Sequence, residues 1–244
     1  MNTPDSNPGV PFPEPGPRKG SAAVRSKVFV VDDHTMFREG LRQLIDREPG
    51  LSVCGDAADM ESALAGLRET RPDVVLVDIS LTGASGIDLI KAIKLEHEEL
   101  PILVVSMHDE SLYAERALRA GAMGYVMKHQ PAKSMKAAIH KVLSGDMYLS
   151  EKMASNVISR FMRGETDKPG SPVELLSDRE LEVFRMLGEG KGTRLIAEQL
   201  GVTVATVNSF RNRIKEKLKL KSSTEVMLQA IRWSQESFPP ASQT

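Results

Sequence analysis

Cysteine is almost absent from this chain of 244 residues, because Cys54 is the single one. One cysteine cannot form an internal disulfide, and Cys54 lacks the spaced Cys and His companions of a zinc site. The sequence also lacks an apolar run near the roughly 18 residues of a membrane-spanning helix, and its N-terminus lacks the apolar core of a secretory signal. These absences exclude a disulfide-stapled mini-protein, and we expect a cytoplasmic protein with no membrane partner.

The whole chain has no excess of either sign of charge, but its two parts do. The 32 Lys and Arg nearly balance the 33 Asp and Glu, for a net charge of -1. Residues 27–148 hold 14 basic and 19 acidic side chains, a net charge of -5, whereas residues 173–233 hold 11 basic and 8 acidic ones, a net charge of +3. The split predicts two domains with different partners.

Residues 27–148 alternate short apolar runs with helical periods. Runs rich in β-branched residues, such as 28–31, 74–77 and 102–105, are typical of strands buried on both faces of a parallel sheet. A weaker run at 51–54 and another at 125–127 complete five strands, with an amphipathic helix after each. We therefore predict an α/β doubly wound, flavodoxin-like domain with a parallel five-stranded sheet.

The rest of the chain divides into tails, a linker and a second domain. Residues 1–26 contain six of the fourteen prolines and are expected to form a disordered tail. A linker with a short helix and a Gly/Pro cluster is expected at 149–172, and a C-terminal tail at 234–244. Residues 173–233 show no strand pattern and predict a small all-α domain of four helices, with capping boxes at 177–180 and 222–225.

Polar side chains follow four of the predicted strands. Asp32 and Asp33 end the first strand, Asp78 the third, Ser106 the fourth and Lys128 the fifth. In an open parallel sheet these positions meet at one edge, where ligands bind. Three converging carboxylates need a cation, and oxygen ligands suit Mg²⁺. Each residue alone would more often be structural; together they predict phosphoryl transfer onto Asp78, with Ser106 and Lys128 holding the remaining charge.

A basic helix is the chief feature of the second domain. Residues 193–200 and 203–218 predict two helices joined by a turn at Gly201, and the apolar spacing of the second leaves a polar face. That face is expected to read bases through Asn208, Ser209 and Asn212. Basic side chains around it are expected to contact phosphates of double-stranded DNA, the alternative being a solvated surface helix; they are Arg211, Arg213, Lys215 and Lys217.

The first domain resembles the receiver domain of bacterial two-component response regulators. The matching residues are 30–34, 75–78, 104–106 and 124–128. The resemblance implies that a sensor histidine kinase donates a phosphoryl group to Asp78, and that the receiver assists only its own phosphorylation and dephosphorylation. It further implies that Asp33, Asp78 and the backbone carbonyl of Ser80 bind Mg²⁺, that Asp32 contributes through water, and that Tyr125 is a switch whose rotamer follows Ser106.

The second domain resembles the LuxR-type helix-turn-helix of the NarL/FixJ class of response regulators, through residues 176–183, 196–200, 206–214 and 217–218. The two resemblances together imply a transcription regulator that forms a homodimer on DNA when it is phosphorylated. Two alternatives stay open at this stage. One is a phosphatase of the haloacid dehalogenase type, which needs two aspartates separated by one residue, whereas Asp32 and Asp33 are adjacent. The other is an interaction protein whose receiver works without phosphorylation.

Overall fold

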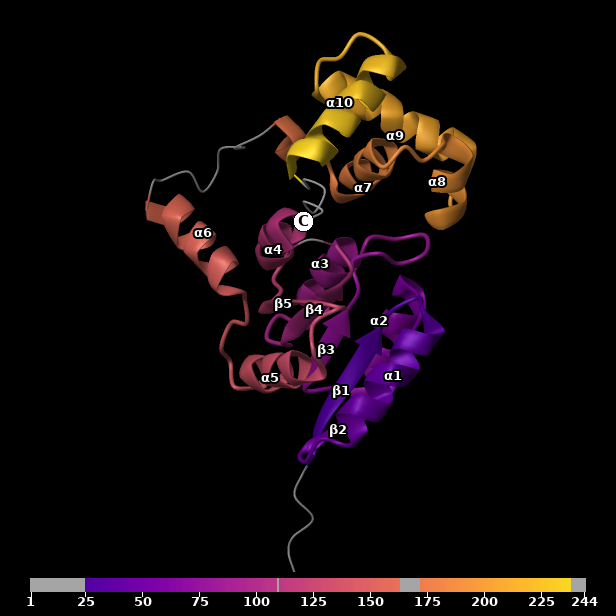
Figure 1. Cartoon of the computed structure of the whole chain (residues 1–244). Coiled ribbons are helices and arrows are strands. Elements are labelled where there is room, and N and C mark those ends of the chain that lie inside the picture. Colours follow the sequence, from indigo (N-terminus) through magenta and orange to yellow (C-terminus); the bar gives the residue numbers. More distant parts are fainter. Residues whose placement is uncertain (1–24, 109, 163–171, 238–244) are drawn as a thin grey trace, which may run out of the picture.

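The first domain is built on a five-stranded parallel sheet (Figure 1). The computed structural model of the chain describes residues 25–108, 110–162 and 172–237. The strands are β1 (Ser26–Val31), β2 (Leu51–Ala57), β3 (Val74–Val77), β4 (Ile102–Ser106) and β5 (Gly124–Met127). Their order is β2-β1-β3-β4-β5, so the direction of winding reverses between β1 and β3. A ligand site is expected beyond the carboxyl ends of these two strands.

Helices cover both faces of the sheet. One face packs against α1 (Thr35–Asp46) and α5 (Ala132–Leu143). The other packs against α2 (Met60–Thr70), α3 (Gly86–Glu96) and α4 (Glu110–Arg119). The architecture confirms the predicted doubly wound domain.

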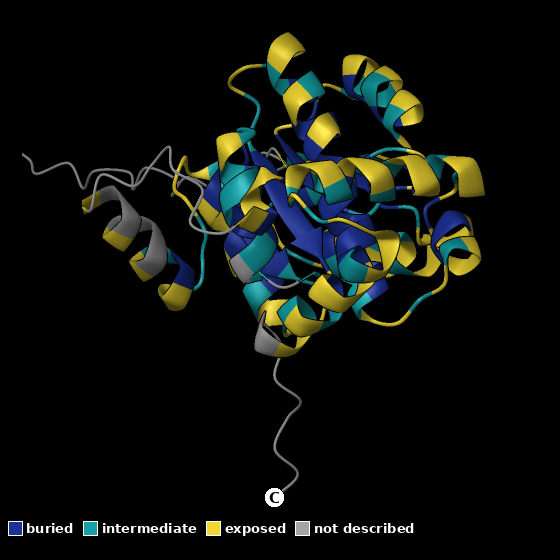
Figure 2. Ribbon diagram, turned by 90° about the horizontal axis from the view of Figure 1, so that it is seen from above, coloured by how far each residue is buried: buried dark blue, intermediate teal, exposed yellow. Residues whose placement is uncertain are grey.

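The central strands are buried on both sides, as their apolar runs predict. Every residue of β3 and β4 is buried. Side chains alternate along a strand, so Val75 and Val77 join one apolar cluster while Val74 and Leu76 join the other. Figure 2 shows this buried layer beneath helices whose outward surfaces are exposed.

The C-terminal part of the chain is helical, which confirms the predicted all-α domain. A linker helix, α6 (Glu151–Met162), precedes a short 3₁₀ helix, η1 (Pro172–Leu175). The domain itself consists of α7 (Asp178–Gly188), α8 (Thr193–Gln199), α9 (Val204–Lys217) and α10 (Ser223–Ser237).

The two predicted capping boxes differ in the structure. At α7 the box is complete, because Ser177 accepts from the Glu180 N–H and the Glu180 carboxylate accepts from the Ser177 N–H. At α10 the Ser222 hydroxyl accepts from the Glu225 N–H, but the Glu225 carboxylate accepts from the N–H of Lys221, one residue earlier than a box requires.

The helical domain lies over the edge of the sheet at which the strands end (Figure 1). Arg179 of α7 donates to the Leu81 carbonyl over 2.9 Å, and the Gly83 N–H donates to the Leu200 carbonyl over 3.3 Å. Leu81 and Leu181 belong to the same buried apolar cluster. The two domains thus share an interface that is partly apolar and partly hydrogen-bonded.

Some expectations fall outside the described residues. Residues 1–24 of the Pro-rich tail, residues 163–171 of the linker and residues 238–244 of the C-terminal tail are among these. Within the described part of the chain, none of the helices has both the length and the apolar character that crossing a membrane requires.

Candidate functional site

An acidic pocket lies where β1 and β3 end. Asp32 follows β1 and Asp78 follows β3, and the Asp78 N–H donates to the Val31 carbonyl over 2.9 Å. Asp32, Asp33, His34 and Asp78 each offer a ligand atom, and these atoms lie within 4.8 Å of one another. The structure therefore brings the three predicted carboxylates together. His34, which directly follows Asp33 in the chain, joins them.

Lys128 closes the pocket from the end of β5. Its Nζ lies 2.6 Å from Asp32 Oδ2 and 2.7 Å from Asp78 Oδ2. Burial alone would lower the pKa of Lys128, but the two carboxylates outweigh it and raise the pKa. The ammonium also lies 4.5 Å from the centre of the Phe37 ring. Lys128 is thus held as a cation beside Asp78.

Asp78, like Asp32, is almost fully enclosed, with 3% of its side chain exposed. Burial raises the pKa of Asp78 to about 6, although Lys128 opposes the shift. Its Oδ1 is buried and accepts no hydrogen bond from the described residues. One oxygen thus binds Lys128 while the other remains available to a cation.

The backbone of Asp78 is also fixed by its neighbours. Gly86 starts α3 and its N–H donates to the Ile79 carbonyl over 2.7 Å. A Cβ at Gly86 would lie 1.9 Å from the Asp78 carbonyl oxygen, so no other residue fits this approach. The hydrogen bond from Gly86 to Ile79 holds the loop that follows Asp78 against the start of α3.

Ser106 and Tyr125 lie at the same edge and meet at His108. The Ser106 hydroxyl accepts from the His108 N–H over 3.1 Å, and the Tyr125 hydroxyl donates to the His108 carbonyl over 2.8 Å. Both side chains are buried. The predicted switch pair is therefore connected through the backbone of the loop between β4 and α4.

Ser80 carries a contact that sequence reasoning missed. Its Oγ lies 2.5 Å from His108 Nε2 and donates to Glu182 Oε1 over 3.1 Å. Burial, followed by the positive charges of Arg185, Lys128 and Lys191, lowers the pKa of His108 to about 3. The ring therefore stays neutral, and a carboxylate from the helical domain reaches the loop that follows Asp78.

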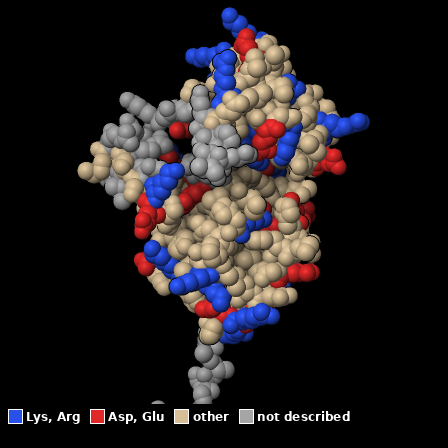
Figure 3. Space-filling view, viewed as in Figure 1, with Lys and Arg blue, Asp and Glu red and all other residues tan. Residues whose placement is uncertain are grey.

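In the helical domain, α9 presents the predicted polar face. Val207 and Ile214 are fully buried, whereas Asn208, Ser209 and Asn212 are exposed. Thr203 caps the helix by accepting from the Thr206 N–H. Figure 3 shows Lys and Arg side chains projecting from the outer end of this domain. The geometry suits a nucleic-acid interface.

The four predicted phosphate-binding side chains differ in what they contact. Arg213 is exposed and Lys215 is half-buried. Arg211 donates to the Thr193 hydroxyl of α8 over 3.1 Å, and Lys217 Nζ lies 2.6 Å from Glu180 Oε2 of α7. Arg211 and Lys217 therefore also hold the helices of the domain together.

We expect Lys217→Met to lower the free energy of unfolding of the helical domain by about 1–3 kcal/mol, because Glu180 is buried and loses its cationic partner. Urea unfolding followed by fluorescence measures the loss, since Trp233 is the single tryptophan and its ring packs on Phe184. Lys215→Met is the control. Equal midpoints for the two variants would contradict a stabilising role for the pair.

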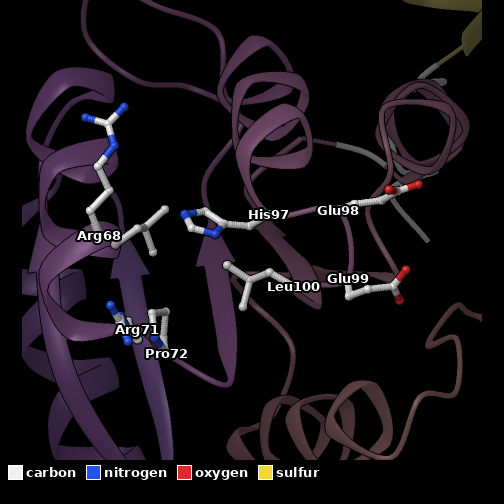
Figure 4. Close-up of a pocket in the computed structure, with 8 residues that line it drawn as sticks. Arg68, Arg71, Pro72, His97, Glu98, Glu99 and Leu100 are labelled. Carbon is white, nitrogen blue, oxygen red and sulfur yellow. The ribbon is translucent and has the colours of Figure 1, made fainter.

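A second hollow lies at the opposite edge of the sheet (Figure 4). Pro72 and Leu100, which precede β3 and β4, line it together with Arg68, Arg71 and His97. None of the predicted site residues lies there, so the acidic pocket and the hollow are separate features.

Comparison with known families agrees with the geometry. Residues 28–140 match the family model of the response regulator receiver domain. Residues 174–230 match that of the bacterial regulatory proteins of the luxR family. A two-component response regulator of the LuxR family from Aurantimonas sp. SI85-9A1 has a similar structure, with 36% identity, a TM-score of 0.53 and coverage of 57% of this chain and 99% of its own. RcsB from Salmonella enterica serovar Typhimurium, solved bound to the promoter rprA in the presence of the phosphomimetic BeF3-, shows the same fold at 23% identity, with a TM-score of 0.55 over 85% of this chain and 98% of its own.

Similarity to individual proteins extends over both domains. The response regulator GacA of Pseudomonas syringae pv. syringae (strain B728a) is 34% identical over 206 residues, which cover 84% of this chain and 95% of GacA. The oxygen regulatory protein NreC of Staphylococcus carnosus (strain TM300) is 31% identical over 210 residues, which cover 84% of this chain and 97% of NreC. The chain belongs to the response regulators that join a receiver domain to a LuxR-type helix-turn-helix domain.

Proposed function

We propose that this response regulator binds DNA under the control of phosphorylation at Asp78, with a sensor histidine kinase as the phosphodonor. Residues 27–148 receive the phosphoryl group and residues 173–233 bind DNA. The observation that carries the proposal is the Asp78 carboxylate, which is buried and bound through one oxygen to Lys128. The RcsB structure, solved on a promoter with a phosphomimetic present, supports the combination by analogy.

The transfer uses Lys128, whose Nζ lies 2.7 Å from Asp78 Oδ2, and Ser106, which ends the neighbouring strand β4. The Asp78 carboxylate attacks the phosphorus atom, the new O–P bond forms, and the bond to the donor breaks. Lys128 and the Ser106 hydroxyl hold the phosphoryl oxygens. The chain thus assists only its own phosphorylation and dephosphorylation and is not an enzyme for another substrate.

The acidic pocket suits Mg²⁺. Asp78 Oδ1 is buried without a hydrogen-bond partner among the described residues, and the neighbouring donors are mostly carboxylate oxygens. Asp33, Asp78 and the Ser80 carbonyl would hold the ion directly, with Asp32 contributing through water. When bound, Mg²⁺ supplies positive charge that neutralises phosphoryl oxygens during transfer.

DNA recognition rests on α9. Asn208, Ser209 and Asn212 face outward and are proposed to read base edges in the major groove. Arg213 and Lys215 are proposed to contact phosphates. Arg211 and Lys217 remain predicted phosphate contacts, although in this structure they bind side chains of their own domain. The base-reading residues and these four basic residues together form the proposed DNA-binding surface.

Phosphorylation is proposed to shift the chain from monomer to homodimer, because a symmetric dimer places two recognition helices about one helical turn of DNA apart. An operator is first obtained by selecting, from a random pool, DNA fragments that the chain binds. Sedimentation of the phosphorylated and unphosphorylated chain, free and with such a fragment, measures the association. We expect dimers on DNA only with a phosphodonor. Equal association constants in both states would instead favour a receiver that works without phosphorylation.

A further inference from the structure

The hollow at the edge of the sheet opposite the acidic pocket lies between the ends of two helices (Figure 4). Arg71 caps the end of α2, and His97 caps the end of α3. The hollow has a volume of about 670 Å³, which suits a small organic molecule. Its walls include Leu67 and Pro72, which are buried, and Leu100, which is partly buried. The hollow can therefore cover the apolar part of a ligand.

The acidic side chains around the hollow are matched by cations of the protein itself. Arg68 donates two hydrogen bonds to the Glu96 carboxylate of α3, over 2.6 and 2.9 Å. Glu98 and Glu99 both attract the Lys94 ammonium. In Figure 4 the carboxylates of Glu98 and Glu99 point away from the arginine side of the hollow. These acids therefore leave the arginine side open to a negatively charged group.

Arg71 supplies an unpaired positive charge. Its guanidinium forms no hydrogen bond or ion pair with any residue that the structure describes, and the residue is exposed. Its φ is 46°, a left-handed conformation that glycine adopts without strain. A strained backbone of this kind is typical of positions where the side chain has a function. The end of α2 carries partial negative charge, which Lys27 offsets by donating to the Thr70 carbonyl over 2.7 Å.

His97 adds an unpaired polar atom to the same hollow. Its Nε2 is buried and has no hydrogen-bond partner among the described residues. In Figure 4 its ring points toward the arginine side of the hollow. Buried polar atoms normally have a partner, and an imidazole nitrogen can donate or accept. The hollow thus combines apolar walls with one unpaired cation and one unpaired ring nitrogen.

We propose that this hollow is a binding site for a small aromatic carboxylate. The carboxylate pairs with the Arg71 guanidinium, whose planar fork matches two carboxylate oxygens. The aromatic ring lies against the apolar walls, where it buries a large area with little loss of rotational freedom. The hollow lies at the edge of the sheet away from Asp78, so the inference goes beyond the proposed function and does not depend on phosphorylation.

The test titrates cinnamate into the full chain by calorimetry at fixed ionic strength. We expect saturable binding at a single site. Arg71→Gly removes the guanidinium and should weaken this binding about tenfold or more, because a hydrogen-bonded charge pair is lost. The same variant should keep or raise the midpoint of urea unfolding, since glycine adopts a positive φ without strain. Arg71→Asn, which also tolerates the left-handed conformation, replaces it if the glycine variant does not fold.

The matched control is Lys219→Gly in the helical domain. Lys219 is exposed and, with a φ of 55°, is the second non-glycine residue of positive φ in the described part of the chain. Its replacement also removes a cation and relieves a left-handed turn, but away from the hollow, so cinnamate should bind as it does to the parent chain. Two other ligands separate the contributions. Cinnamyl alcohol keeps the ring without the charge, acetate keeps the charge without the ring, and each should bind about tenfold more weakly than cinnamate or worse.

Each outcome decides the proposal. Weaker binding of cinnamate by Arg71→Gly alone, with both other ligands binding weakly, supports the site. Failure of cinnamate to saturate the parent chain, equal affinity in Arg71→Gly, or an equal loss in Lys219→Gly overturns it. Equal affinity for cinnamyl alcohol overturns the pairing with Arg71, and equal affinity for acetate overturns the role of the apolar walls. Phosphorylation of Asp78 is left untouched by any of these results.

Discussion

We expect the Asp78→Asn variant to take up no phosphoryl group from acetyl phosphate and Mg²⁺, whereas the parent chain forms a base-labile acyl phosphate. An asparagine keeps the shape of the side chain but removes the nucleophilic carboxylate that Lys128 holds at 2.7 Å. Intact-mass measurement before and after mild base detects the adduct and its loss.

The control for this prediction is Asp146→Asn, which changes an exposed aspartate elsewhere in the receiver. It is expected to take up phosphoryl groups as the parent chain does. Equal uptake by the Asp78→Asn and parent chains would place the acceptor on another residue.

Reversing the charges of Arg213 and Lys215 together should weaken binding to all DNA sequences about 60-fold at 0.1 M salt, because each lost phosphate contact removes about 0.9 from the salt slope. The loss should be uniform, since phosphate contacts carry no sequence information. Titrations of an operator and of an unrelated duplex at several salt concentrations measure both quantities.

The matched contrast is Asn212→Ala on the same helix, which should cost about 1–3 kcal/mol at particular base pairs and leave the salt slope unchanged. Circular dichroism checks that each variant keeps its helices. If the double variant shows the same salt dependence of DNA binding as the parent chain, Arg213 and Lys215 face solvent rather than DNA.

The receiver pocket is predictable from the sequence because residues that follow parallel strands meet at one edge of the sheet. Asp32, Asp78 and Lys128 each follow a strand of one parallel sheet, so their meeting requires only that the sheet form. No long-range side-chain pairing has to be guessed.

Contacts between domains could not be predicted in the same way. Glu182 and Ser80 are 102 residues apart, and nothing in the spacing of α7 distinguishes Glu182 from an ordinary charged residue. The helical period likewise places Lys217 beside the polar face of α9, but the partner of its ammonium, Glu180, depends on how α7 packs against α9. The incomplete capping box at Glu225 is a similar case, because its carboxylate accepts from the N–H of Lys221 and not from that of Ser222.

The most direct test of the account is the affinity of the full chain for a selected operator with and without acetyl phosphate, in the parent protein and in Asp78→Asn. The account predicts that the phosphodonor tightens binding of the parent chain and has no effect on Asp78→Asn. Identical affinities for the parent chain in both conditions, or an equal gain in Asp78→Asn, would contradict the control of DNA binding by phosphorylation of Asp78.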